Sequence, residues 1–266
     1  MSLIWHKAIV DLGHGMNIST MFGKHVDSLQ SNPTLVLLHE ALGSIAMWKN
    51  IPEQLALATG CDVLVYERRG YGESTFIPLP REDDYLIEEG EVWLPRLLGQ
   101  LGLDNVILVG HSDGGSIALI GAAAMPDKVR CIVTEAAHIY MDHLTKAGIE
   151  AAVERYHNSD LPERLARYHG DRTDNLFRAW HETWLRPERK PMNFRPWLSG
   201  IHCPALVIQG EQDEYAVPEQ VTDICSGIGA RAEPLFIEKC GHVPHFEQRE
   251  IFLTKTSAFI RLHLND

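Results

Sequence analysis

Six short apolar runs, separated mostly by helix-length segments, constrain the fold of this 266-residue sequence more than any other feature. Each run is apolar at nearly every position, which is typical of strands that are buried on both faces. Strands that alternate with helices predict a parallel, doubly wound α/β sheet. The runs occupy residues 34–39, 63–66, 106–110, 131–134, 205–209 and 234–237. Helices are predicted at about residues 46–59, 86–101, 112–125 and 218–228, the second of them interrupted by Gly90 and Pro95.

Residues 136–200 break this alternation, because they contain helical patterns but no convincing strand. An insertion between two strands of such a sheet would lie at the carboxyl edge, where ligands bind in these folds. We therefore expect a core made of residues 1–135 and 201–266, and a helical cap, or lid, made of residues 136–200. Most of the many aromatic residues in the cap are expected to pack against the core. Trp180 and Trp184 are candidates to line a substrate pocket.

A Gly-x-Ser-x-Gly sequence around Ser112 stands between a predicted strand and a predicted helix. A strand that turns sharply into a helix strains the residue at the turn, and the flanking Gly110 and Gly114 remove side chains that would clash there. The turn pushes the hydroxyl of Ser112 out of the sheet, beside the amides and the positive end of the following helix. The motif predicts Ser112 as a nucleophile, with a helix-capping serine in a glycine-rich turn as the alternative.

A serine nucleophile needs a base within hydrogen-bond reach, and position must choose among the fourteen histidines of the chain. His242 follows the last apolar run, in a loop that reaches the same sheet edge as Ser112, and Gly241 permits an unusual backbone angle there. His245 is the rival, three residues later, at the start of the final helix. His111 adjoins Ser112 and is expected to pack against the strand ends.

The base in turn needs a carboxylate that holds its tautomer and stabilises its cationic form. Asp213 follows the fifth apolar run, again at the carboxyl edge. Glu211 and Glu214 beside it, and Glu135 after the fourth run, are alternatives. The chain order serine, aspartate, histidine is the order expected when the serine stands on such a turn.

Acyl transfer through a serine also needs two backbone N–H groups to stabilise the oxyanion of the tetrahedral intermediate. One is expected from Asp113, directly after the nucleophile. The other is expected from the loop after the first apolar run, His39-Glu40-Ala41-Leu42, in which we choose Ala41 by position.

With these parts assembled, the chain resembles the α/β-hydrolase superfamily over almost its whole length. Five segments carry the resemblance: LLHEALGSIAMW (37–48), VYERRGYGES (65–74), LVGHSDGGSIAL (108–119), VIQGEQDEYAVP (207–218) and CGHVPHFE (240–247). The resemblance implies an α/β-hydrolase fold with a mostly parallel eight-stranded sheet and helices on both faces. It also implies a helical lid inserted after the sixth strand, and no cofactor.

Two residues depart from the usual pattern of that family. Glu40 follows His39 where the family usually has glycine, and Glu67 stands in a turn where it usually has aspartate. Glu67 is expected to brace that turn. Glu40 either disfavours anionic substrates or braces its own loop, and we favour the second. His39, Glu40 and His111 join the two cap tryptophans as candidates for contacting substrate.

Composition excludes several other functions. The net charge of −12 argues against a nucleic-acid-binding protein, which usually carries a basic face. We find no signal-peptide pattern, and no apolar stretch approaches the ~18 residues that a membrane span needs. Five widely spaced cysteines without a Cys-x-x-Cys pair favour reduced thiols in a cytoplasm. The histidines show no metal-ligand spacing, so no metal is expected, and the sequence leaves open whether the chain forms a homodimer.

Together these features predict a serine hydrolase that cleaves a small or medium carboxylic ester or lactone through an acyl-enzyme intermediate. Two other reactions suit the same residues: hydrolysis of a carbon–carbon bond in a vinylogous diketone, and cofactor-free oxygenation with the His–Asp pair as base. A non-enzymatic ligand receptor that keeps the triad is a further alternative. The choice of substrate rests on analogy, because a fold does not fix a function.

Overall fold

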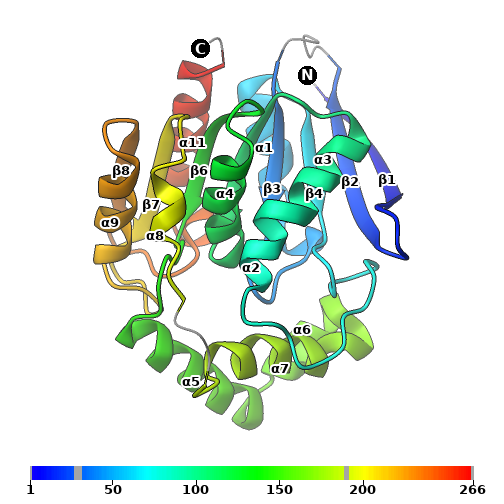
Figure 1. The fold of residues 1–266 in the computed structure, drawn as a ribbon, viewed down its shortest axis with the longest axis vertical. Helices are drawn as coiled ribbons and strands as arrows, with labels where there is room; N and C mark the ends of the chain where they lie inside the picture. The colour runs from blue at the N-terminus through cyan, green and yellow to red at the C-terminus, as the bar shows by residue number, and fades with distance from the viewer. Residues whose placement is uncertain (1, 27–31, 189–191, 265–266) are drawn as a thin grey trace.

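The computed structural model describes residues 2–26, 32–188 and 192–264, built around one eight-stranded sheet (Figure 1). The strand order is β1-β2-β4-β3-β5-β6-β7-β8. β1 pairs antiparallel with β2, and β2 with β4, whereas the neighbours from β4 to β8 pair in parallel. The expected mostly parallel, eight-stranded sheet is confirmed. The strands are β1 (Leu3–Asp11), β2 (Asn17–His25), β3 (Thr34–Leu38), β4 (Val63–Tyr66), β5 (Val106–His111), β6 (Val129–Glu135), β7 (Ala205–Gly210) and β8 (Ala232–Ile237).

All six apolar runs form parallel strands, β3 to β8, as predicted. Strands β3, β4, β5 and β7 are buried along their whole length, but most residues of β8 are not. Phe236 of β8, for example, is 37% exposed. The reason is that β8 is the outermost strand of the sheet, so fewer neighbours cover its side chains. The apolar pattern therefore overestimated the burial of this strand.

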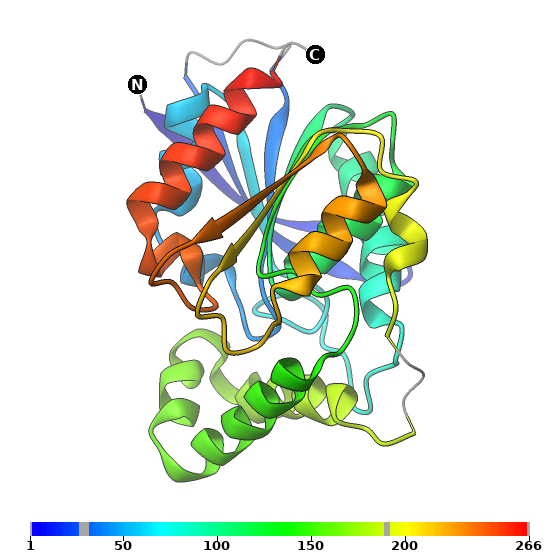
Figure 2. The same cartoon turned by 90° about the vertical axis from the view of Figure 1, so that its left-hand side faces the viewer.

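Helices cover both faces of the sheet (Figure 2). α1 and α11 lie together on one face, and α3, α4 and α9 lie on the other. Each face has its own apolar core, with Ile51 and Phe252 fully buried in one and Ile117 and Ile224 fully buried in the other. No helix in the described part of the chain has the length and apolar character to cross a bilayer. The α-helices are α1 (Ile51–Thr59), α2 (Tyr85–Glu88), α3 (Leu94–Leu101), α4 (Asp113–Ala124), α5 (His143–Asn158), α6 (Leu161–His169), α7 (Thr173–Trp184), α8 (Arg195–Leu198), α9 (Glu219–Ile228), α10 (Pro244–Glu247) and α11 (Arg249–Leu262).

The helix predicted at residues 86–101 is interrupted, as its glycine and proline suggested. It divides into α2, a π-helical turn at Glu89–Trp93 and α3. A Cβ atom on Gly90 would lie 2.6 Å from the side chain of Ile120 in α4, so the glycine allows the turn to pack directly on α4. Pro95, which has no backbone N–H to donate, follows the π-helical turn directly, in the first turn of α3.

Between β6 and β7 the described chain forms helices α5 to α8 and no strand. Figure 1 shows α5, α6 and α7 gathered at one end of the sheet, apart from the helices that cover its faces. These three helices fall within the expected cap, residues 136–200. Residues 189–191 of that range lie outside the described residues, as do 1, 27–31 and 265–266 of the expected core.

Candidate active site

Ser112 occupies the sharp turn between β5 and α4. Its φ of 52° is positive, a conformation that a residue with a side chain adopts only under strain. Close backbone approaches require glycine on both sides of it. A Cβ on Gly110 would lie 2.2 Å from the carbonyl oxygen of Gly114, and a Cβ on Gly114 would lie 2.0 Å from that of Leu38. The turn therefore places Ser112 just past the end of β5, before the first turn of α4, as the motif predicted.

Three loops bring Ser112, His242 and Asp213 together. Oγ of Ser112 lies 3.1 Å from Nε2 of His242, and Nδ1 of His242 lies 2.8 Å from Oδ1 of Asp213. Asp213 also accepts the backbone N–H of Tyr215 at 2.9 Å. Although burial alone would raise the pKa of Asp213, the charge and hydrogen bond of His242 lower it. The carboxylate is thus set to hold Nδ1–H of the imidazole, which leaves Nε2 facing the serine hydroxyl.

Two residues that the sequence analysis did not single out hold His242 in place. The carboxylate of Glu247 accepts the backbone N–H of Gly241 at 2.7 Å and that of Val243 at 2.9 Å, one on each side of His242. The ring of Tyr215 lies 4.6 Å from the imidazole of His242. Both residues fall within segments that carry the family resemblance. That resemblance was the signal in the sequence that could have indicated their role.

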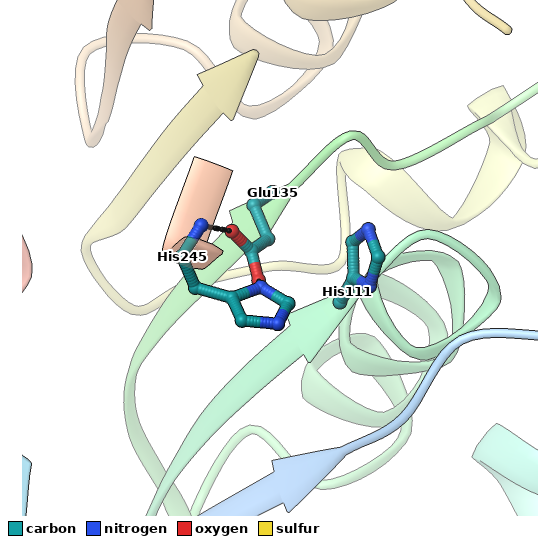
Figure 3. A group of neighbouring side chains, drawn as sticks. All are labelled: His111, Glu135 and His245. Atoms are coloured by element: carbon teal, nitrogen blue, oxygen red, sulfur yellow. Dashed lines mark hydrogen bonds and ion pairs between the residues drawn. The ribbon is translucent and has the colours of Figure 1, made fainter. Parts of the chain in front are cut away.

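The rival histidine, His245, bonds to a different carboxylate (Figure 3). Its Nδ1 lies 2.5 Å from Oε1 of Glu135, and its backbone N–H donates to Oε2 of Glu135 at 3.1 Å. The other two alternatives for the acid, Glu211 and Glu214, are exposed. The side-chain contacts that end at Ser112 therefore run through His242, not through His245.

His111, Glu135 and His245 each offer an atom that could bind a metal, and these atoms lie within 4.8 Å of one another (Figure 3). Both oxygens of Glu135 already accept hydrogen bonds from His245. Nε2 of His111 lies 2.9 Å from the carbonyl oxygen of His242. Because both oxygens of Glu135 and Nδ1 of His245 are engaged with each other, and Nε2 of His111 contacts the backbone of His242, we assign the cluster to holding the loop of His242.

Ala41 and Asp113, the residues expected to supply oxyanion-hole amides, both line the cavity that contains Ser112. Ala41 lies in the loop after β3, and Asp113 is the first residue of α4. Because Asp113 begins α4, its backbone N–H lies at the positive end of the helix dipole, which favours a negative charge there. The carbonyl oxygen of Ala41 accepts the hydroxyl of Tyr71 at 2.7 Å, which anchors its loop from the buried side.

The cavity in front of Ser112 has a volume of about 350 Å³ and a mostly apolar wall. Helices α5, α6 and α7 form one side, and loops of the core form the other. The size and character suit a small or medium apolar ligand. The cap contributes Thr145, Ile149, Leu165, Trp180 and Trp184, and the core contributes Met47, Trp48, Val243 and Phe246 among others.

Four of the five candidate substrate-contacting residues line this cavity: Glu40, His111, Trp180 and Trp184. His39 does not. Its side chain is fully buried, its Nδ1 lies 2.8 Å from the carbonyl oxygen of Glu40, and its Nε2 accepts the backbone N–H of Arg68 at 3.1 Å. Burial and the charge of Arg68 lower the pKa of His39 to about 3, so the ring is neutral. We therefore assign His39 to fixing the loop rather than to contacting substrate.

Glu40 and His111 form a pair at the edge of the cavity. Oε2 of Glu40 lies 3.6 Å from Nδ1 of His111. Burial alone would raise the pKa of Glu40, but contact with His111 lowers it to about 2. Burial would also lower the pKa of His111, yet contact with Glu40 and the charge of Glu135 raise it to about 9. Both groups are therefore charged at neutral pH, and Glu40 is directed at His111, in keeping with a bracing role.

Comparison with known proteins shows which family the chain belongs to. A family model for the alpha/beta hydrolase fold matches residues 33–192. The chain is 36% identical over 256 residues to the sn-1-specific diacylglycerol lipase ABHD11 of Mus musculus, covering 86% of this chain and 81% of the relative. The protein of that name in Danio rerio is 32% identical over a shorter alignment, which covers 53% of this chain and 44% of the relative.

Solved structures agree with the fold. A 2-hydroxy-6-oxo-6-phenylhexa-2,4-dienoate hydrolase from Rhodococcus has a TM-score of 0.80 at 14% identity, covering 98% of this chain and all of that one. A thermophilic esterase from Thermogutta terrifontis has a TM-score of 0.72 at 19% identity, again covering 98% and 100%. At these identities the likeness is one of fold alone. The family model, which matches residues 33–192, and the mouse relative, at 36% identity, show more than a shared fold. This chain belongs to the alpha/beta hydrolase fold family.

Proposed function

We propose that this chain is a serine hydrolase that cleaves a small or medium carboxylic ester or lactone through an acyl-enzyme intermediate. The observation that carries the proposal is the line of contacts from Asp213 through His242 to Ser112, at 2.8 and 3.1 Å, beside an apolar cavity. A serine activated by an adjacent imidazole, itself oriented by a carboxylate, is the arrangement that acyl transfer requires.

The reaction follows from these contacts. Oγ of Ser112 attacks the carbonyl carbon while Nε2 of His242 takes its proton. The oxyanion of the tetrahedral intermediate accepts the backbone N–H groups of Ala41 and Asp113. His242 then protonates the departing alkoxide, which leaves as an alcohol and creates the acyl-enzyme. A water molecule, deprotonated by the same imidazole, releases the carboxylic acid and restores Ser112.

The apolar lining and the known relatives favour ester substrates. A cavity walled by Trp48, Trp180 and Trp184 suits an apolar acyl or alcohol group better than a charged one. The mouse relative is named as a lipase, and one structural neighbour is an esterase. Lactones share the reacting carbonyl, and they remain within the proposal for that reason.

The proposal includes two further parts. Residues 136–200 act as a cap over the site, which is supported by the five side chains of α5, α6 and α7 in the lining of the cavity. The protein works in a reducing, cytoplasmic setting, which is supported by the thiols of Cys61, Cys203, Cys225 and Cys240, none of them in a disulfide.

Replacement of the nucleophile tests the proposal. Wild-type protein and Ser112→Ala are assayed on a panel of p-nitrophenyl esters of increasing acyl length, with lactones, thioesters and a vinylogous diketone alongside. We expect turnover of esters by the wild type and its loss in Ser112→Ala. Ester turnover by Ser112→Ala at the wild-type rate would contradict the mechanism. Turnover of the diketone but not of esters would instead assign the site to carbon–carbon bond hydrolysis.

A further inference from the structure

A buried arginine that the mechanism above does not use lies behind both oxyanion-hole amides. Arg68 follows β4, and its side chain is only 1% exposed. Its guanidinium contacts the loop of Ala41 on one side and the side chain of Asp113 on the other. A buried cation is stable only where hydrogen bonds and opposite charge surround it, so this placement needs an explanation.

On the side of Ala41, Arg68 holds the peptide group that carries the proposed donor. Nη2 of Arg68 donates to the carbonyl oxygen of Glu40 at 2.7 Å, and Nδ1–H of the neutral His39 donates to the same oxygen at 2.8 Å. This oxygen and the N–H of Ala41 belong to one planar trans peptide, in which they point in opposite directions. When the carbonyl oxygen of Glu40 is held on the buried side, the N–H of Ala41 therefore points away from the buried side. The two bonds also polarise the peptide and strengthen the N–H as a donor.

On the side of Asp113, Arg68 compensates a charge. Oδ2 of Asp113 lies 3.4 and 3.5 Å from the two terminal nitrogens of Arg68 and accepts the hydroxyl of Tyr85 at 2.7 Å. The carboxylate is 2% exposed and belongs to the residue whose N–H is the second proposed donor. Left uncompensated, its charge would oppose the oxyanion that the same residue must stabilise.

The contacts continue into the cap. Nε1–H of Trp184, the last residue of α7, donates to the hydroxyl of Tyr85 at 2.9 Å. Trp184 is 2% exposed and also lines the cavity. A chain of hydrogen bonds thus runs from the cap to both proposed oxyanion donors. The four side chains that carry it, which we call the relay, are Trp184, Tyr85, Asp113 and Arg68.

We propose that the relay aligns the two oxyanion donors only while α7 covers the site, so that docking of the cap and catalysis are coupled. The inference rests on the proposed serine-hydrolase function and extends it. Arg68, Tyr85 and Trp184 act as positioning residues, because they reach the reacting atoms through Asp113 and through the peptide between Glu40 and Ala41.

Two conservative substitutions break the relay without emptying the core. Tyr85→Phe removes the hydroxyl between Asp113 and Trp184, and Trp184→Phe removes the indole N–H. Trp197→Phe is the matched control, because it removes an indole N–H bond of 2.8 Å to Glu91 that lies outside the cavity lining. Arg68 itself is a poorer first choice, since its removal would leave a buried carboxylate unpaired.

Each variant is assayed for kcat and KM on a p-nitrophenyl ester and for inhibition by a trifluoromethyl ketone, which forms a tetrahedral adduct with a reactive serine. Complete loss of one oxyanion donor lowers kcat by about 10²- to 10³-fold, so misalignment is expected to lower it by about tenfold. The affinity for the ketone is expected to fall by a similar factor in both relay variants, and KM of Tyr85→Phe to change little. Trp197→Phe is expected to stay within about twofold of the wild type.

The double variant Tyr85→Phe/Trp184→Phe gives the sharpest test. Because both side chains act through one chain of bonds, we expect its kcat to equal that of Tyr85→Phe alone. Wild-type kcat and ketone affinity in a folded Tyr85→Phe, or losses that add in the double variant, would overturn the relay. Ester turnover by Ser112→Ala would instead overturn the underlying function, so the two failures are distinguishable.

Discussion

Two carboxylate–imidazole pairs lie at the same edge of the sheet, and their histidines are only three residues apart. Asp213 and His242 are joined at 2.8 Å, and Glu135 and His245 at 2.5 Å. Both carboxylates are completely buried. Sequence position alone ranked the two histidines as candidates for the same role. The structure separates them, since the line of side-chain contacts to Ser112 runs through His242.

The two pairs differ most in how many of their carboxylate oxygens accept hydrogen bonds. Both oxygens of Glu135 accept bonds from His245, and the ring of His245 packs 4.8 Å from Trp48 and 4.2 Å from Phe246. Oδ2 of Asp213, in contrast, has no hydrogen-bond partner among the described residues. Buried polar groups are usually satisfied, and exceptions concentrate at functional sites. We infer that the pair with Glu135 stabilises the loop, whereas the pair with Asp213 serves the chemistry.

The largest expected contrast is in catalysis. Asp213→Asn keeps an acceptor for the backbone N–H of Tyr215 but no longer fixes the tautomer of His242. We expect kcat to fall by about 10⁴-fold. Glu135→Gln, the matched change in the other pair, is expected to lower kcat by less than about tenfold, because it touches no reacting atom. Steady-state ester hydrolysis measures both, and similar losses in the two variants would remove the distinction between the pairs.

Stability is expected to show the opposite order. Glu135→Gln removes a buried charge with both oxygens bonded, so we expect the free energy of unfolding to fall by about 3 kcal/mol. Asp213→Asn should lower it by no more than about 1 kcal/mol, because that carboxylate is less well satisfied. Urea unfolding of the two variants and the wild type at one pH gives both values. A larger loss in Asp213→Asn would contradict a structural role for Glu135.

The smallest effect concerns His111, whose ring lies 5.3 Å from that of His242 and 5.1 Å from that of His245. Contact with Glu40 and the charge of Glu135 raise the pKa of His111 from 6.5 to about 9 despite its burial. A raised pKa stabilises the folded state fully below about pH 6.5, and this stabilisation is lost as the pH rises through about 9.

Glu40→Gln removes one of these charges. We expect it to lower the free energy of unfolding by about 1 to 2 kcal/mol at pH 6 and by much less at pH 9.5. Unfolding measured at both pH values checks this, and a difference that does not change with pH would contradict the ion pair. In the same variant, the ratio of activity toward anionic and neutral esters is expected to stay unchanged, since Glu40 braces its loop.

The sequence was sufficient for the parts of the site that local chemistry determines. Strand-helix alternation predicted the parallel sheet. The glycines around Ser112 predicted its turn, because a Cβ atom on Gly114 would lie only 2.0 Å from a backbone oxygen. Loop order along the sheet placed His242 and Asp213 near it. The structure brings these three side chains into contact, and their catalytic roles stay predictions.

What the sequence could not provide depends on side chains that meet only in the folded chain. His39 is the first residue of the loop that contains Ala41, yet its ring turns into the core, where it accepts the backbone N–H of Arg68. The relay joins residues 68, 85, 113 and 184, which no spacing rule connects. Arg68 lies within a segment that carries the family resemblance, but nothing in that segment indicates that it pairs with Asp113.

The central claim is that His242, and not His245, activates Ser112. The most direct test is the rate at which a fluorophosphonate probe labels Ser112, located by peptide mass spectrometry, in the wild type, His242→Gln and His245→Gln, each well below its melting temperature. We expect labelling to slow by about 10³-fold or more in His242→Gln and to stay within about tenfold of the wild type in His245→Gln. Rapid labelling in a folded His242→Gln, or its loss in His245→Gln alone, would contradict the claim.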